Sequence, residues 1–134
     1  MKKELSRIVI AVLVLALASV ACNFSASTAN IRDAYMARDN AGADRTTVFA
    51  AEDVFYCIVE VANAPDDTTV KAIWYAVDVE GMDRNSVIGQ IETAAGQEVI
   101  PFILSNENLW PAGKYKVEIY LNNELDTTLR FKVK

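Results

Sequence analysis

The chain has 134 residues, of which 52% are hydrophobic and 23% are charged, and it contains two cysteines and no histidine. This length suits one domain, and the apolar fraction is too high for a disordered protein. The absence of histidine excludes serine–histidine–aspartate triads, cysteine–histidine dyads, histidine-ligated zinc and imidazole proton relays.

The N-terminal segment combines a basic start with a short apolar run. The first seven residues contain three basic side chains, Lys2, Lys3 and Arg7, and one acid, Glu4. Residues 8–18 then lack any polar side chain. Even extended to residue 21, the run would be about 21 Å long as a helix, whereas a bilayer core is about 30 Å thick. This pattern is typical of an export signal. A helix belonging to the fold is the weaker alternative, because the run is apolar on every side. We therefore predict a signal peptide over residues 1–21.

The end of this segment, Leu-Ala-Ser-Val-Ala-Cys over residues 17–22, resembles the lipobox of bacterial lipoproteins. Ala21 and Cys22 match that motif and Val20 is acceptable, whereas Ser19 stands where an aliphatic residue is usual. In that family the cysteine after the cleavage site is diacylated. The resemblance thus implies a lipid anchor at Cys22 on the extracytoplasmic face of a bacterial membrane. The small residues at 19 and 21 also fit an ordinary cleavage site, which would release a secreted protein.

The segment after the signal, residues 22–29, is small, polar and uncharged, which predicts a short tether before a domain over residues 30–134. Without residues 1–21 the chain keeps 10 basic and 17 acidic residues, a formal charge near −7. This charge argues against binding to nucleic acid.

Cys57 lies in an apolar, strand-like run with no basic residue nearby in sequence. If Cys22 is acylated, Cys57 is a lone cysteine, and we predict a buried thiol rather than a nucleophile. A disulfide between the two cysteines is the alternative, and it requires the lipobox interpretation to be wrong.

From residue 30 onward the hydrophobic pattern has a period of two. The expected strands cover residues 31–37, 46–49, 54–62, 69–79, 98–105, 114–121 and 125–133. Residues 86–93 form either a short edge strand or an irregular crossover. Pro101 favours an edge position or a bulge. Asn122 and Asn123 tolerate positive φ and predict a tight hairpin turn before the last strand. About seven strands in this length predict an all-β fold, an antiparallel β-sandwich.

Two tryptophan-containing segments carry a resemblance to immunoglobulin-like domains of bacterial surface proteins. They are Trp74 in a central strand and the stretch Trp-Pro-Ala-Gly-Lys-Tyr-Lys-Val over residues 110–117. In such domains a Pro-x-Gly-x-Tyr corner precedes a strand, which implies that Tyr115 packs under the corner and bonds to the backbone. The resemblance extends to small bacterial surface lipoproteins with one such domain, although the cysteine pair of antibody domains is missing. This architecture hosts many unrelated functions.

An acidic loop offers the best metal candidate. Asp78, Glu80, Asp83 and Asn85 place oxygen donors around Gly81, as a hard cation such as calcium requires. The loop lacks the EF-hand spacing and its bidentate glutamate. The alternative is a solvated loop between strands.

Aromatic side chains provide the candidate ligand contacts. Trp74 is expected in the core, whereas Tyr75 points to the opposite face and Tyr120 lies on a solvated face. Trp110 stands at a loop, where we expect partial exposure. These three, Tyr75, Trp110 and Tyr120, are the predicted contact residues.

These observations predict a non-enzymatic, lipid-anchored, extracytoplasmic domain that needs no cofactor and binds a protein or another envelope component. The alternative is a module for a small ligand, either carbohydrate or calcium. An enzyme built on carboxylates would need one acid held in an apolar pocket, and the sequence identifies no such pair.

Overall fold

The computed structural model describes residues 28–134, so the predicted signal peptide, Cys22 and most of the tether lie outside the described residues. The strands are β1 (Asn30–Ala37), β2 (Val48–Phe49), β3 (Phe55–Ala62), β4 (Thr69–Val79), β5 (Ser86–Ala94), β6 (Val99–Leu104), β7 (Gly113–Leu121) and β8 (Glu124–Val133). Within residues 28–134 there is no helix with the length and apolar character needed to cross a bilayer.

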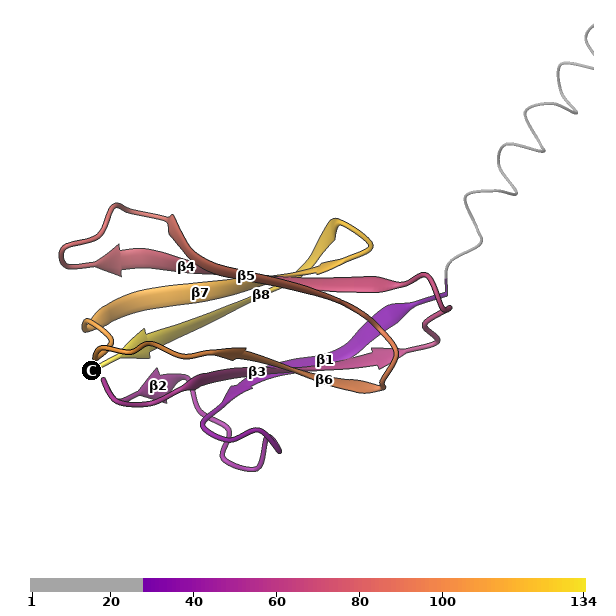
Figure 1. The fold of residues 1–134 in the computed structure, drawn as a ribbon, viewed down its shortest axis with the longest axis horizontal. Helices are drawn as coiled ribbons and strands as arrows, with labels where there is room; N and C mark the ends of the chain where they lie inside the picture. Colours follow the sequence, from indigo (N-terminus) through magenta and orange to yellow (C-terminus); the bar gives the residue numbers. More distant parts are fainter. Residues whose placement is uncertain (1–27) are drawn as a thin grey trace, which may run out of the picture.

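The strands form two facing sheets (Figure 1). One sheet has three strands in the order β1-β3-β6, and the other has five in the order β2-β8-β7-β4-β5. All pairings are antiparallel except that of β2 with β8, which is parallel. The all-β sandwich expected from the period-two pattern is confirmed, with eight strands instead of about seven.

The two ambiguous segments are both edge strands. Residues 86–94 form β5 at the edge of the five-stranded sheet, and β6, which contains Pro101, lies at the edge of the three-stranded sheet. Proline has no N–H to donate to a neighbouring strand. In an edge strand one side has no neighbour, so this missing donor leaves no backbone acceptor unpaired.

The core lies between the sheets, where alternate side chains of each strand point inward. On β4, Val70, Ala72, Trp74 and Ala76 are fully buried while the residues between them are half-buried. Phe55 of β3 sits at the centre of the aromatic part of this core. Its ring contacts those of Phe49, Trp74, Trp110, Tyr115 and Phe131 at centroid distances of 4.4–6.2 Å.

The β7–β8 hairpin turns at Asn122 and Asn123, whose φ angles are 50° and 66°, as the primed two-residue turn requires. A bulge between Ile119 and Tyr120 shifts the register at the start of β8. Leu125 therefore lies opposite Tyr120 and is 53% exposed. In the sequence Leu125 alternates in step with Phe131 and Val133, which face the core, and the bulge is the reason that Leu125 does not.

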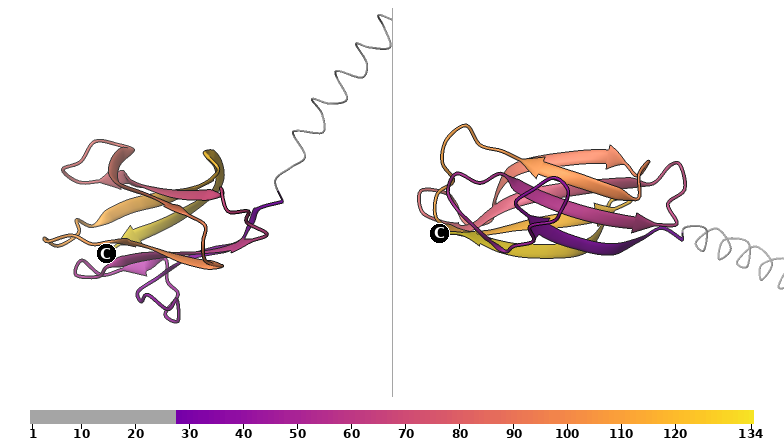
Figure 2. Two further views of the ribbon diagram at one scale, coloured as in Figure 1. Left: turned by 45° about the vertical axis from the view of Figure 1, so that its right-hand side comes forward. Right: turned by 90° about the horizontal axis from the view of Figure 1, so that it is seen from below.

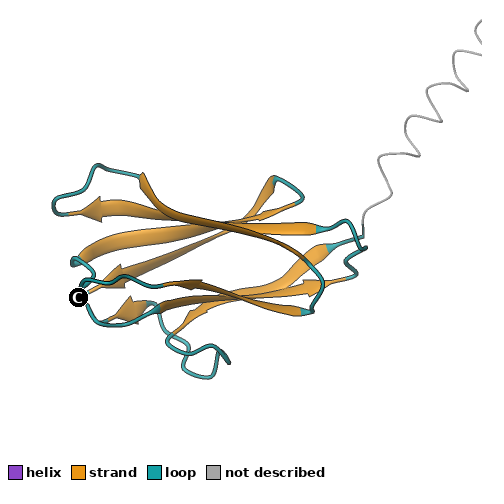
Figure 3. Cartoon of the chain, viewed as in Figure 1, coloured by secondary structure: helices purple, strands orange, loops and turns teal. Residues whose placement is uncertain are grey.

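The chain enters the sandwich at the end opposite its C-terminus (Figures 1 and 2). All segments between the strands are loops or turns (Figure 3). The β1–β2 loop extends over the outer side of the three-stranded sheet (Figure 2, right).

Candidate functional site

Trp110 and Tyr115 belong to the core at the β6–β7 corner. The Tyr115 hydroxyl donates a hydrogen bond of 2.6 Å to the carbonyl oxygen of Pro111. The Trp110 ring stacks on Phe55 with centroids 4.4 Å apart, and its Nε1–H donates to the carbonyl oxygen of Asp53 at 3.0 Å. Because Trp110 is only 7% exposed, the expectation of an accessible indole is wrong. The predicted corner tyrosine is confirmed.

The acidic β4–β5 loop does not gather a ligand set. Among residues 28–134 no three acidic, cysteine or histidine side chains converge on a common point. The carboxylate of Asp78 lies 4.0 Å from the guanidinium of Arg84, and Asn85 adopts a φ of 54° in the turn. The structure thus does not bring Asp78, Glu80, Asp83 and Asn85 together as calcium would require, and it fits the solvated-loop alternative.

Tyr75 and Tyr120 meet on the outer face of the five-stranded sheet. The Tyr120 hydroxyl donates to Oε1 of Glu118 at 3.3 Å, and Nζ of Lys116 lies 3.7 Å from Oε2 of the same carboxylate. The Lys116 ammonium also lies 4.8 Å from the Tyr75 ring centroid, and the Lys71 ammonium lies 4.9 Å from that of Tyr120. Burial, together with the Glu118 carboxylate, raises the pKa of Tyr75 to about 12. The two rings are therefore held by neighbouring lysines and are not a free stacking platform.

The outer face of the three-stranded sheet is apolar on its β6 side. Its β6 residues include Val99 and Ile103, which are 44% and 43% exposed. Their neighbours in register on β3 are Glu60 and Tyr56, and Pro101 lies opposite Ile58. We name the group Tyr56, Ile58, Val99, Pro101 and Ile103 the apolar face.

Ile58 shows how far the apolar character of this face extends. It is 1% exposed although Cys57 and Val59, its neighbours along β3, are the residues that point into the core. Tyr35 of β1 and Pro101 flank Ile58 in the adjacent strands. The outer face of an antiparallel sheet commonly carries polar side chains, so the apolar character here is unusual for a solvated face.

The β1–β2 loop covers the neighbouring part of the same outer side at Tyr35. The Arg45 guanidinium lies 3.5 Å from the Tyr35 ring centroid. A Cβ on Gly42, which has a φ of 71°, would come within 2.6 Å of the Tyr35 hydroxyl. The loop therefore packs closely on Tyr35 and leaves the β6 side of the face uncovered.

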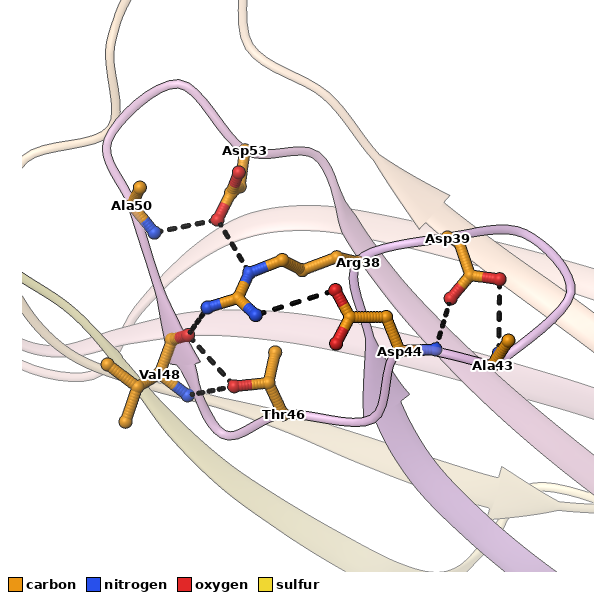
Figure 4. A network of polar contacts seen from close by, with 8 residues as sticks. All are labelled: Arg38, Asp39, Ala43, Asp44, Thr46, Val48, Ala50 and Asp53. Atoms are coloured by element: carbon orange, nitrogen blue, oxygen red, sulfur yellow. Dashed lines mark hydrogen bonds and ion pairs between the residues drawn. The ribbon is translucent and has the colours of Figure 1, made fainter.

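Arg38 holds this loop in place through three partners (Figure 4). Its guanidinium donates to Asp53 at 3.2 Å and to the carbonyl oxygen of Val48 at 2.8 Å, and it lies 3.5 Å from Asp44. Asp53 also accepts a hydrogen bond of 2.7 Å from the backbone N–H of Ala50. No local sequence pattern indicates this network.

Asp39 fixes the turn beside the arginine. Its carboxylate accepts hydrogen bonds from the backbone N–H groups of Asp44 at 2.7 Å and Ala43 at 3.0 Å (Figure 4). These bonds hold the pKa of Asp39 below its usual value. The turn-forming sequence over residues 39–42 was the available signal, but it did not reveal the partners of Arg38.

Cys57 is a fully buried free thiol. Burial raises its pKa from 9.0 to about 12, which is opposite to the shift that a nucleophilic cysteine needs. The geometry around Cys57 therefore supports a packing role.

Comparison with solved structures identifies the architecture. An immunoglobulin-like protein from Pseudomonas aeruginosa aligns with a TM-score of 0.51 and 14% identity, covering 81% of this chain and 98% of that one. The fold is an immunoglobulin-like β-sandwich. No protein-family model and no curated protein sequence matches the chain.

Two enzyme structures also align with this chain. An alkylpurine DNA glycosylase from Pseudomonas fluorescens, solved bound to DNA with an abasic-site analogue, aligns with a TM-score of 0.51 and 14% identity over 81% of this chain and 31% of its own. A superoxide reductase from Ignicoccus hospitalis gives a TM-score of 0.44 at 20% identity, covering 80% of each chain. At 14% identity the likeness to the glycosylase concerns the fold alone.

Proposed function

We propose that this chain is a lipid-anchored, extracytoplasmic binding module that holds a protein partner on the apolar face of its three-stranded sheet. The observation that carries the proposal is the exposure of Val99 and Ile103 beside the buried Ile58, on a side of the sandwich that would otherwise be polar.

The chemistry of the apolar face favours a protein as its partner. Burial of apolar surface is the dominant favourable contribution in most protein–protein association. Glu60 and Asp33 stand opposite each other at one end of this outer side, and Asp33 is paired with Arg45 at 3.6 Å, so these three side chains give no excess of positive charge to attract a polyanion. A protein that presents its own apolar surface fits both features.

The anchoring part of the proposal depends on the sequence. The basic start, the short apolar run and the Ala21–Cys22 junction support export and acylation. The domain begins at Asn30, eight residues after Cys22, which is consistent with a short tether. Two acyl chains would give firm attachment, because each buried methylene contributes about 0.8 kcal/mol.

The anchor is tested by Cys22→Ser in the producing cells, followed by membrane fractionation. We expect the variant to leave the membrane fraction while the unmodified chain stays in it. Equal retention of both forms would refute lipid attachment at Cys22.

The docking face is tested with Val99→Asp and Ile103→Asp, each compared with Val87→Asp. Val87 is 57% exposed on β5 of the other sheet and serves as the matched control. A partner captured by cross-linking in cells is then purified and titrated into each variant by calorimetry. We expect the first two variants to lose binding and the control to retain it. Equal affinity for all three variants would refute the proposed face, as would a concentration-dependent homodimer that uses it.

A further inference from the structure

Two cross-strand pairs of like charge stand side by side on the outer face of the five-stranded sheet. Lys114 of β7 lies directly opposite Lys132 of β8, and Lys116 lies directly opposite Arg130. Side chains that face each other across antiparallel strands have Cβ atoms about 5 Å apart, where like charges repel. Because Lys114, Arg130 and Lys132 are exposed, solvent screens most of this repulsion, but a cluster of cations is unexpected in a domain whose net charge is near −7.

Three of these four cations lack a compensating acid. Lys116 is paired with Glu118 at 3.7 Å. Lys114, Arg130 and Lys132 have no carboxylate within 4.0 Å in the part of the chain that the structure describes. Asp78 lies opposite Lys114 across the sheet, but its carboxylate is directed to Arg84 at 4.0 Å.

The three unpaired cations surround a hollow of about 250 Å³. Val77 lines it where β4 carries a bulge between Ala76 and Asp78. Thr47 lines it from the segment before β2, where its carbonyl oxygen accepts a hydrogen bond of 2.9 Å from the backbone N–H of Lys132. Basic residues of two strands and a threonine of a third segment thus line the hollow, together with Tyr115 and Phe131, and the lining surface is mostly apolar.

We propose that this hollow binds a phosphoryl group, with Lys114, Arg130 and Lys132 donating to its oxygens and the Thr47 hydroxyl completing the site. The planar guanidinium of arginine matches two oxygens of a phosphoryl group, and lysines supply point charges around it. Binding would remove the repulsion between the paired cations.

The position of the hollow favours a ligand other than the membrane that carries the anchor. Lys114 and Lys132 lie where β7 begins and β8 ends, at the C-terminal end of the sandwich, whereas the chain enters at the opposite end (Figure 1). A tethered domain therefore presents this hollow away from its own point of entry. The hollow also lies on the opposite sheet from the apolar face, so either proposal can fail without the other.

The test is a calorimetric titration of the full chain in neutral detergent with inorganic phosphate and with pyrophosphate. We expect binding that weakens as salt rises, tighter for pyrophosphate because it carries more charge. Lys132→Gln and Arg130→Gln should each weaken it about tenfold, since each removes a charge-assisted hydrogen bond. Lys71→Gln is the matched control on the same face, about 20 Å along the strand direction at about 3.3 Å per residue, and should bind as the unmodified chain does.

Thermal unfolding separates a ligand site from a structural role. Without ligand, Lys132→Gln should unfold at the same temperature as the unmodified chain or higher, because it relieves the repulsion from Lys114. Pyrophosphate should raise the unfolding temperature of the unmodified chain and of Lys71→Gln but not that of Lys132→Gln.

Three results would overturn the proposal. The first is no binding of millimolar pyrophosphate by the unmodified chain. The second is an equal loss in Lys71→Gln and Lys132→Gln, which would mean diffuse attraction of anions. The third is binding to vesicles of phosphatidylglycerol, but not of phosphatidylcholine, without binding of phosphate or pyrophosphate, which would make the face a membrane contact.

Discussion

The hydroxyl of Tyr115 ties the β6–β7 loop to the start of β7 through its bond to Pro111. Tyr115→Phe removes this bond and leaves the Pro111 carbonyl without that donor, so we expect the free energy of unfolding to fall by about 1 kcal/mol. Tyr120→Phe is the control, because its bond of 3.3 Å lies on the outer face. Urea unfolding of both variants measures the difference, and an equal loss in the two would contradict the role of the corner bond.

Cys57 gives the domain a defined response to alkaline pH. The folded thiol keeps its proton to about pH 12, whereas the unfolded thiol ionises near its ordinary pKa of 9.0. Ionisation therefore favours the unfolded state as the pH rises above about 9, and the contribution of Cys57 to stability is lost over this window. Tyr75 acts in the same direction, but from its ordinary pKa of 10.0.

We expect the free energy of unfolding to fall by about 1 kcal/mol more between pH 8 and pH 10 in the chain with Cys57 than in Cys57→Ala. Both forms carry Cys22→Ser, so that one thiol accounts for the difference, and urea unfolding at the two pH values measures it. Identical pH slopes would show that the thiol ionises in the folded state as readily as in the unfolded one.

At the scale of elements, the turn of the β7–β8 hairpin contains two adjacent asparagines that make different contributions. Both have positive φ, but the side chain of Asn122 also accepts a hydrogen bond of 3.0 Å from the backbone N–H of Thr69 on β4. At Asn123 the turn requires only a positive φ, and glycine adopts a positive φ with no steric cost.

Asn123→Gly should therefore maintain or raise the unfolding temperature, whereas Asn122→Gly should lower the free energy of unfolding by about 1 kcal/mol through loss of the bond to Thr69. Differential scanning calorimetry of the two single variants provides the comparison. If the two substitutions had the same effect, the Asn122 side chain would contribute nothing at this turn.

The same hairpin shows what sequence can predict about such elements and where it stops. The alternation of residues 114–121 and the two asparagines determine the strands and the turn, because both are local properties. The bulge at Ile119 and Tyr120 is not visible in the alternation, and it turns Leu125 outward. Register depends on pairing between strands, so one inserted residue changes the face of a side chain without any local signal.

The candidate site was less predictable than the strands for a related reason. The three partners of Arg38 lie 6, 10 and 15 residues further along the chain, so only the folded structure reveals how Arg38 holds the β1–β2 loop. Trp110 follows a polar loop, yet the Phe55 ring and the Asp53 carbonyl draw it into the core. The cationic hollow likewise depends on the register of β7 against β8.

At the scale of the whole molecule, the two sheets differ on their outer sides. Five of the ten basic residues in the described chain lie on the outer face of the five-stranded sheet: Lys71, Lys114, Lys116, Arg130 and Lys132. The three-stranded sheet presents Val99 and Ile103 instead. Under the two proposals, one side of the sandwich would hold an apolar protein surface and the other an anion, and both could be occupied together.

Phe55 joins these two sheets into one cooperative unit. The Phe55 ring extends from the three-stranded sheet and contacts rings from β2, β4, β7 and β8 of the other sheet, together with Trp110 of the corner.

Phe55→Ala should lower the free energy of unfolding by about 3–5 kcal/mol, which is a large part of the about 5–15 kcal/mol that stabilises a typical domain. Phe55→Leu refills part of the space and should cost less. Tyr56→Ala, on the outer side of the same strand, should cost about 1 kcal/mol or less. Urea unfolding followed by tryptophan fluorescence and by circular dichroism measures all three, and each should give one coincident transition. Separate transitions for the two probes in Phe55→Ala, or a similar loss in Tyr56→Ala, would show that the sheets are not joined through this ring.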